Sequence, residues 1–365
     1  MSVTSDLDHM RHALRLAERG LGTTAPNPAV GCVIVAPDGR IVGRGWTGIG
    51  GRPHAETRAL EAAGMAARGA TAYVTLEPCS HHGKTPPCAD ALLAAGIARV
   101  VAAVEDPDPR VRGGGVARLR TAGIAVDVGL LGAEATALNW GFFLRQRAGR
   151  PAVTLKIAQS VDGRIASSGG ESRWITGPAA RNYGHLLRAR HDAILIGVET
   201  AVADDPELTC RIPGLERHSP LRVVLDSRLR LPMESRLAQT ARETPTLVFT
   251  SAASDGPLTA CGVEVVQAVR DARGRPDVAQ VLRHLADRGI TRVLVEGGGS
   301  VHASFLDRGL VDRLEVFVAP LVLGGAGAPA VAALAALGLE EAQRFRCEAR
   351  RRLGGDVLES YVASA

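Results

Sequence analysis

The chain has 365 residues, enough for two domains of ordinary size. Hydrophobic residues make up 46% of it and charged residues 22%, a globular mixture that argues against long disordered segments. Aromatic residues are only 3% and the net charge is a mild +5, which argues against a nucleic-acid-binding surface built on stacking and strong positive charge.

The first twenty residues contain early acidic side chains and no apolar core, so we expect no signal peptide. The six cysteines are then expected to be metal ligands or buried thiols rather than disulfides. The uncharged run 316–339 contains prolines and a glycine cluster, which favour a strand, a glycine loop and a small-residue helix over a membrane span. These features predict a cytoplasmic protein without a membrane partner.

Helical and strand patterns alternate in the first half, which predicts a sheet with helices on its faces. A turn at 37–39 joins two β-branched runs into a hairpin. The expected helices cover 8–19, 54–64, 86–96, 116–123 and 135–147, and the expected strands cover the hairpin 29–45, then 70–76, 98–104 and 124–131.

The pattern restarts after the polar stretch 148–151, which is typical of a domain boundary. Expected strands cover 151–166, 192–198, 221–226, 246–250, 263–269, 292–295 and 314–320, with helices over 178–190, 277–289 and 302–308. The halves share no repeat, so we expect two different α/β domains, one at 1–147 and one at 151–365.

Three residues of the first half have the chemistry of a zinc site. His54 begins a predicted helix, Cys79 follows a predicted strand, and Cys88 begins the next predicted helix. One imidazole and two thiolates leave the fourth tetrahedral position of zinc open, as in catalytic sites. Glu56 completes the H-x-E and P-C signature of zinc-dependent base deaminases, in which a glutamate carries the proton. Because side chains two apart on a regular helix diverge, we expect His54 or Glu56 to lie at an irregular helix cap.

Two glycine-rich segments differ in their context. The match to G-x-G-x-x-G at 43–48 opens no helix, so we expect no dinucleotide there. The run Glu296-Gly297-Gly298-Gly299-Ser300 follows a predicted strand and precedes a helix, where bare backbone amides can hold a phosphate.

The motifs PNPAVG (26–31), PHAE (53–56) and EPCSHHGKTPPC (77–88) resemble the bifunctional deaminase–reductase family of riboflavin biosynthesis. The resemblance implies that His54, Cys79 and Cys88 bind Zn²⁺ and that Glu56 is the proton shuttle. It also implies that Asn27 contacts the pyrimidine and that Lys84 meets the ribose phosphate. The sequence departs from the family pattern at Thr47, where the family often has histidine.

The resemblance continues through the second half in TLKIAQSVDGRIA (154–166), SRWITG (172–177), the run 191–211, VEGGGS (295–300) and LVLGG (321–325). It implies a dihydrofolate-reductase-like domain that uses NADPH to reduce a ribosyl group to ribityl. Lys156, which with Lys84 makes up all the lysine of the chain, and Asp204 hold the family's catalytic positions. The implied substrate contacts are Ser172, Arg188, Leu208, Arg211 and Glu296, and the implied cofactor contacts are Ala158, Trp174, Thr200, Asp204, Ser227, Gly298 and Gly299.

The leading hypothesis is one chain that performs two consecutive steps, deamination of a phosphorylated pyrimidine and reduction of its sugar. We expect a homo-oligomer that acts on a small molecule and binds no nucleic acid. The alternatives are a nucleic-acid or nucleoside deaminase with a non-catalytic NADPH-binding domain, and a purely regulatory NADPH-binding module. Sparse aromatic residues argue against the first alternative, and the intact Glu56 with its ligand set argues against the second.

Overall fold

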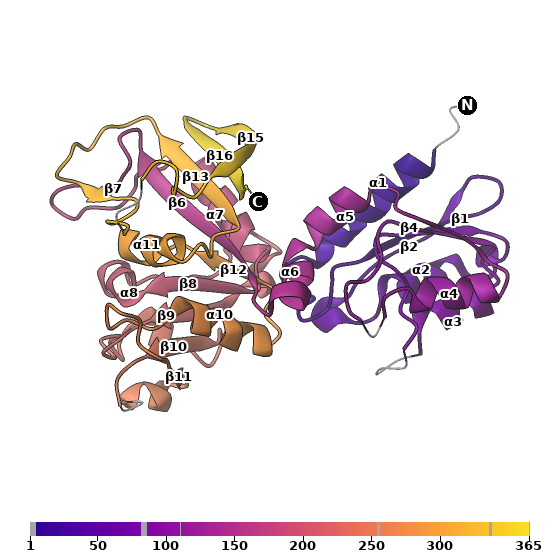
Figure 1. Ribbon diagram of the computed structural model, residues 1–365, viewed down its shortest axis with the longest axis horizontal. Coiled ribbons are helices and arrows are strands. Elements are labelled where there is room, and N and C mark those ends of the chain that lie inside the picture. The colour runs from indigo at the N-terminus through magenta and orange to yellow at the C-terminus, as the bar shows by residue number, and fades with distance from the viewer. Residues whose placement is uncertain (1–4, 82–85, 110, 254–255, 336–337, 365) are drawn as a thin grey trace. The chain divides into compact units, whose positions relative to one another are not determined.

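The computed structural model describes residues 5–81, 86–109, 111–253, 256–335 and 338–364. The chain forms two compact units, Met1–Gly149 and Arg150–Ala365, coloured indigo to magenta and magenta to yellow in Figure 1. Each unit is a sheet covered by helices and has its own hydrophobic core.

The first unit is built on a five-stranded sheet in the order β2-β1-β3-β4-β5, in which β1 pairs antiparallel with β2 and β3, and β3, β4 and β5 run parallel. Side chains that alternate along the strands enter separate core clusters, one with α2, α3 and α4 and the other with α1 and α5. The strands are β1 (Gly31–Val35), β2 (Ile41–Trp46), β3 (Thr71–Val74), β4 (Arg99–Ala102) and β5 (Ala125–Val128). The helices are α1 (Asp6–Ala17), α2 (Ala55–Ala63), α3 (Cys88–Ala94), α4 (Gly114–Thr121), α5 (Gly132–Leu138) and α6 (Trp140–Ala148).

The glycines of the G-x-G-x-x-G match bring helix α2 close to strand β2. A Cβ atom on Gly43 would lie 2.1 Å from the carbonyl oxygen of Ala59, and one on Gly45 would lie 2.0 Å from that of Ala55. Both distances are far below van der Waals contact, so only glycine allows this spacing. The motif therefore serves helix–sheet packing. This packing sets the position of His54, which precedes α2.

The second unit is built on a nine-stranded sheet in the order β11-β10-β9-β8-β12-β6-β13-β16-β15. The strands from β11 to β13 run parallel, and β16 and β15 continue the sheet antiparallel. Helices α7, α8 and α9 contribute to one core cluster, and α10 and α11 to another. The strands of this sheet are β6 (Ala152–Ser160), β8 (Ala193–Gly197), β9 (Leu221–Leu225), β10 (Thr246–Thr250), β11 (Glu264–Gln267), β12 (Arg292–Val295), β13 (Arg313–Ala319), β15 (Phe345–Leu353) and β16 (Asp356–Ala363). The helices are α7 (Pro178–Ala189), α8 (Val198–Asp204), α9 (Arg236–Gln239), α10 (Val278–Asp287) and α11 (Gly299–Asp307).

The small-residue helix expected within 316–339 is wrong for the part of this run that the structure describes. Instead, the short strand β14 (Ala328–Pro329) pairs with β7 (Arg164–Ala166). The backbone N–H groups of Ala330 and Ala332 donate to other segments, at 3.0 Å in each case. Because these groups are engaged elsewhere and proline has no N–H to donate, the alanine-rich run stays extended. Among the described residues, no helix is long and apolar enough to cross a membrane.

The helix expected over 135–147 is interrupted. Helix α5 ends at Leu138, α6 begins at Trp140, and Asn139 between them has φ −103° and ψ 20°. Phe142 and Phe143 of α6 still pack into the core of the first unit.

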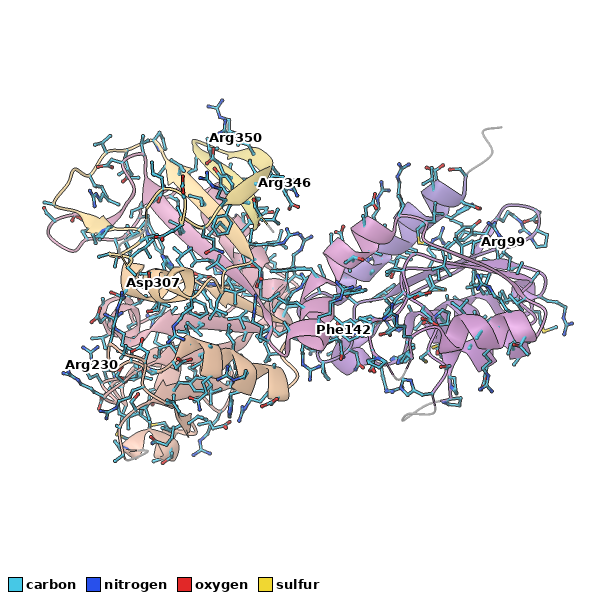
Figure 2. All side chains as sticks on the ribbon, viewed as in Figure 1. Arg99, Phe142, Arg230, Asp307, Arg346 and Arg350 are labelled. Carbon is cyan, nitrogen blue, oxygen red and sulfur yellow. The ribbon has the colours of Figure 1, made fainter. Side chains whose placement is uncertain are left out.

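The hairpin β15–β16 was not expected from the sequence, because its outer strand reads as an arginine-rich polar run. Arg346 and Arg350 project from β15 in Figure 2. Charged side chains on an edge strand discourage pairing with a further strand, so the composition of β15 suits its place at the edge of the sheet.

His191 connects α7 to β6 in the core of the second unit. Its Nδ1 atom donates to the carbonyl oxygen of Leu187 at 2.7 Å, and its Nε2 atom lies 2.8 Å from the hydroxyl of Thr154. Burial lowers the pKa of His191 to about 3.

Since the pKa of His191 is lower in the folded state than its unfolded value of about 6.5, the unfolded state binds the proton first as the pH falls. We therefore expect the second unit to lose up to about 1.4 kcal/mol of unfolding free energy per pH unit between pH 6.5 and 3 through this residue alone. The His191→Gln variant should lack that part of the slope in urea denaturation followed from pH 7.5 to 4. Equal slopes in the two proteins would contradict the assignment.

Candidate functional site

The three expected zinc ligands converge in the first unit. Nδ1 of His54 lies 3.7 Å from Sγ of Cys79 and 3.1 Å from Sγ of Cys88, and all three atoms lie within 4.8 Å of one another. The zinc–ligand bond lengths of a tetrahedral site place ligand atoms about 3.5–3.8 Å apart. The arrangement therefore fits a zinc ion with little adjustment.

The chemistry of the donor set also fits zinc. A hydrogen bond from the Cys88 side chain, helped by His54, lowers the pKa of the Cys79 thiol to about 4. The backbone N–H of Cys88 also donates to Cys79 Sγ at 3.3 Å. The lowered pKa favours the thiolate form of Cys79, which is the form that binds zinc.

The irregular cap that brings His54 and Glu56 to the same side is present. His54 is the N-cap of α2 and has extended backbone angles, φ −68° and ψ 158°, while Glu56 lies in the first turn. Glu56 is 4% exposed, and burial raises the pKa of its carboxyl to about 7. Its side chain also interacts with Cys88. The expectation of an irregular cap is confirmed.

Sequence reasoning assigned no role to Glu77, which begins the motif that holds Cys79. Glu77 is 3% exposed, and its two oxygens accept four backbone N–H groups. Oε1 accepts from Gly115 and Val116 at 3.0 and 3.1 Å, and Oε2 accepts from Asp106 and Gly113 at 3.2 and 2.9 Å. This carboxylate ties the Cys79 loop to the start of α4. The sequence signal that could have pointed to this role was an acidic residue two positions before Cys79.

The loop that carries Asn27 lies against the segment that leads to His54. A Cβ atom on Gly51, which has φ +85°, would lie 1.9 Å from Nδ2 of Asn27. Thr47 is buried, and its hydroxyl accepts from the backbone N–H of Val30 at 2.9 Å. Thr47 thus holds this loop in place. Lys84 lies outside the described residues.

The expected reductase residues gather at the carboxyl ends of four neighbouring strands, β9, β8, β12 and β6. This edge of a parallel sheet is where ligands of α/β folds bind. Ala158 lies in β6, Thr200 in the helix after β8, Ser227 in the loop after β9, Gly298 in the loop after β12 and Gly299 at the start of α11.

Glu296 is the centre of a buried charge cluster at this edge. Arg188 binds it with two hydrogen bonds, of 2.8 and 2.9 Å, and Lys156 Nζ lies 3.7 Å from Oε2. Although burial alone would raise it, the charges of Arg188 and Lys156 lower the pKa of Glu296 to about 2. The carboxylate therefore stays ionised and keeps both cations in fixed positions.

The other expected substrate residues lie on two nearby segments. Ser172 donates from its hydroxyl to Asp204 Oδ1 at 3.1 Å. Arg211 is exposed and forms an ion pair with Glu207 at 3.2 Å. The side chain of Leu208 is buried in the core, and its backbone has φ +55°, so only its backbone is available for a ligand.

The glycine loop after β12 fits a dinucleotide. Gly298 has φ +72°, and a Cβ atom there would lie 3.3 Å from Oγ1 of Thr200. In the described part of the chain, the backbone N–H groups of residues 297–300 donate to no acceptor, which leaves them for a phosphate at the start of α11. The Trp174 ring is 65% exposed and lies 4.5 Å from the Arg181 guanidinium, which leaves an aromatic face at the surface.

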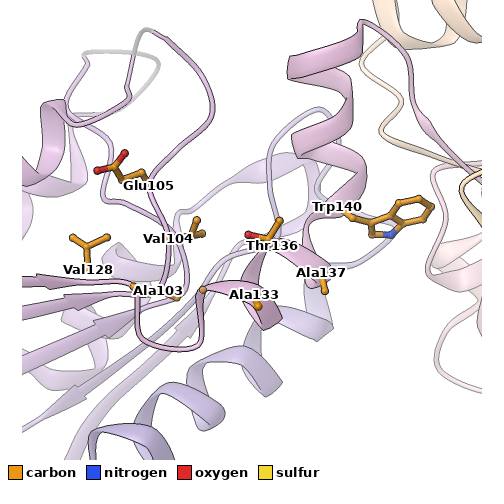
Figure 3. A pocket seen from close by; sticks show the side chains of 10 residues that line it. Ala103, Val104, Glu105, Val128, Ala133, Thr136, Ala137 and Trp140 are labelled. Carbon is orange, nitrogen blue, oxygen red and sulfur yellow. The ribbon is translucent and has the colours of Figure 1, made fainter. Parts of the chain in front are cut away.

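A pocket of about 630 Å³ lies elsewhere in the first unit, beside β4, β5 and the α5–α6 junction (Figure 3). As far as the described residues go, its lining includes none of the expected zinc ligands. It is lined by Ala103, Val104, Glu105, Val128, Gly129, Gly132, Ala133, Thr136, Ala137 and Trp140.

Comparison with protein families gives two matches. Residues 3–104 match the cytidine and deoxycytidylate deaminase zinc-binding region, and residues 151–358 match the RibD C-terminal domain. The first match includes His54, Cys79 and Cys88, and the second includes the glycine loop after β12. Fold and comparisons together define a two-domain deaminase–reductase.

Curated relatives and solved structures match over almost the full length. The riboflavin biosynthesis protein RibD of Escherichia coli strain K12 is 44% identical, with 98% of this chain and 99% of the relative covered. RibD of Aquifex aeolicus is 42% identical, with 97% of both covered. The structure of Acinetobacter baumannii RibD matches with a TM-score of 0.89 and 38% identity, covering 100% of both chains. A diaminohydroxyphosphoribosylaminopyrimidine deaminase/5-amino-6-(5-phosphoribosylamino)uracil reductase from Thermotoga maritima matches with a TM-score of 0.87 and 36% identity, covering 98% of this chain and 99% of that one. The chain belongs to the RibD family of riboflavin biosynthesis proteins.

The role of Glu77 is testable. Because an amide nitrogen cannot accept a hydrogen bond, Glu77→Gln should lose two of the four N–H contacts and destabilise the first unit by about 1–3 kcal/mol. Outer contacts that orient metal ligands typically contribute 10–100-fold in affinity, and we expect a zinc affinity loss in that range by chelator competition. Glu105→Gln is the matched control, because Glu105 lies next to Asp106 in the loop after β4 and is half-exposed. Wild-type affinity in Glu77→Gln would contradict the role.

Proposed function

We propose that the chain catalyses two consecutive steps of riboflavin biosynthesis on one phosphorylated pyrimidine. The first is zinc-dependent hydrolytic deamination of 2,5-diamino-6-(5-phosphoribosylamino)pyrimidin-4(3H)-one. The second is NADPH-dependent reduction of the ribosyl group to ribityl. The observation that carries the proposal is that each unit has its own set of converging reactive groups, His54, Cys79 and Cys88 with Glu56 in one and Lys156 with Glu296 in the other.

In the deaminase unit, His54, Cys79 and Cys88 would hold the zinc ion. Zinc bound there would supply a Lewis acid with an open coordination position. Glu56 would carry a proton on its carboxyl from the attacking water to the leaving amine, which must depart as ammonia. Asn27 would orient the pyrimidine from the loop that faces Gly51. Lys84 would bind the ribose phosphate of the substrate.

In the reductase unit, NADPH would supply a hydride for C1′ of the opened sugar imine. The reduction also consumes a proton, and the Lys156 ammonium is the proposed group that holds it beside the sugar. Arg188 and Glu296 keep Lys156 in place, and Asp204 with Ser172 would bind the sugar hydroxyls. Arg211 would meet the phosphate, Leu208 would contribute its backbone, and the residues Ala158, Trp174, Thr200, Ser227, Gly298 and Gly299 would line the cofactor.

We also propose that the protein works in the cytoplasm as a homo-oligomer and binds no nucleic acid. All six cysteines lie in the described part of the chain and are free thiols, which supports a reducing compartment.

Glu56→Gln should keep its zinc and lose deamination by about 10²–10⁴-fold, because the amide cannot carry the proton. Zinc content by elemental analysis and ammonia release measure the two properties separately. NADPH oxidation with the deaminated intermediate should stay at the wild-type rate and serves as the internal control. Near wild-type deamination would remove Glu56 from its proposed role.

Asp204→Asn should give the opposite result, with normal deamination and reduction slowed about tenfold or more, because the amide loses charged acceptor capacity for the sugar hydroxyls. Asp205→Asn is the matched control. Asp205 is a turn residue with φ +37° that accepts from the backbone N–H of Arg236, and asparagine can replace it in both respects. If both variants reduce the intermediate equally well, Asp204 has no part in the reaction. Deamination of nucleosides or single-stranded DNA in place of the diaminopyrimidine would overturn the proposed function as a whole.

A further inference from the structure

Asn139 interrupts the last helical segment of the first unit, and its side chain binds the backbone of a residue far away in the sequence. Helix α5 ends before it and α6 begins after it, and the residue is 5% exposed. Its side-chain Oδ1 accepts from the backbone N–H of Ala29 at 2.9 Å, and its Nδ2 donates to the carbonyl oxygen of Ala29 at 2.8 Å. A single amide thus satisfies both backbone groups of a residue 110 positions earlier.

These two hydrogen bonds matter because Ala29 is only 2% exposed and water cannot take their place. A buried backbone group without a partner costs about 1–3 kcal/mol. Only a side chain with a donor and an acceptor at amide spacing can satisfy both groups. Aspartate would set an acceptor against the Ala29 carbonyl oxygen, and leucine would leave both groups without a partner.

The loop that Asn139 holds is the one that carries Asn27. After Ala29, the N–H of Val30 donates to the Thr47 hydroxyl at 2.9 Å and the N–H of Gly31 donates to the Thr75 hydroxyl at 3.1 Å. The backbone N–H groups of Ala29, Val30 and Gly31 therefore each donate to a side chain, that of Asn139, Thr47 and Thr75 respectively. Asn27 lies two residues before the first of them, and its amide contacts Gly51 in the segment that leads to His54.

We propose that Asn139 is a positioning residue for substrate recognition in the deaminase unit, acting through the Ala29 backbone to set the direction of Asn27. The inference rests on the proposed function, because it takes the phosphorylated diaminopyrimidine as the ligand that Asn27 orients. On this inference, the α5–α6 junction contributes to substrate binding without touching the substrate.

The test uses full-length Asn139→Leu and Asn139→Asp. The KM for the diaminopyrimidine should rise about tenfold or more, the change that one lost buried hydrogen bond produces. The kcat should change less than about threefold, zinc content should equal that of the wild type, and NADPH oxidation with the deaminated intermediate should be unchanged. Thr136→Ala is the matched control, since Thr136 lies on the same helical segment and lines the pocket of Figure 3; it should keep the wild-type KM.

A double-variant cycle separates positioning from general support of the fold. If Asn139 acts through Asn27, then Asn27→Ala combined with Asn139→Leu should have the KM of Asn27→Ala alone, within about twofold. Tyr73→Phe removes the 2.6 Å hydrogen bond to Asp6 in the same unit, and any effect it has on KM should multiply with that of Asn27→Ala.

Three outcomes overturn the inference. They are an unchanged KM in both Asn139 variants, effects of Asn139 and Asn27 that multiply fully, and a fall in kcat that follows loss of zinc. If Asn139→Leu does not fold, Asn139→Asp decides, because it keeps the acceptor for the Ala29 N–H. A wild-type protein that binds zinc and does not deaminate the diaminopyrimidine overturns the proposed function itself, which is a separate result.

Discussion

A buried carboxylate stays ionised only where donors or cations balance its charge, and this constraint organises both sites. In the first unit Glu77 is balanced by four backbone N–H groups, one of them from Gly115, which packs against Pro78 directly before the proposed zinc ligand Cys79. In the second unit Glu296 is balanced by Arg188 and Lys156. Removing either carboxylate would leave its partners uncompensated, so the reactive groups hold their positions only while these two residues remain.

The two sites differ in how the chain assembles them. The proposed zinc ligands lie between residues 54 and 88, at the N-cap of α2, in the loop after β3 and at the start of α3. The reductase residues extend from Lys156 to Gly299 and meet only because four parallel strands end side by side. The first site is placed by short-range chain geometry with Glu77 as its long-range tie, and the second depends on the complete sheet.

This difference explains what the sequence could predict. The proposed zinc ligands, the irregular cap at His54 and the positions of most strands along the chain follow from local patterns and could be predicted directly. Glu77 and Asn139 could not, because their roles come from partners 29–39 and 110 residues away. The helix expected within 316–339 was wrong for the same reason, since contacts with Gly163 and Gly299 override the helical preference of its alanines.

The position of α5 and α6 has a consequence for where the first half of the chain can be cut. The match to the deaminase zinc-binding region ends at residue 104, yet Phe142 and Phe143 fill the core of this unit and Asn139 closes its Ala29 loop. A fragment that stops where the family similarity stops would expose apolar surface and release that loop. A fragment of the first unit should therefore extend to Gly149, because the helical segment before the boundary belongs to this compact unit.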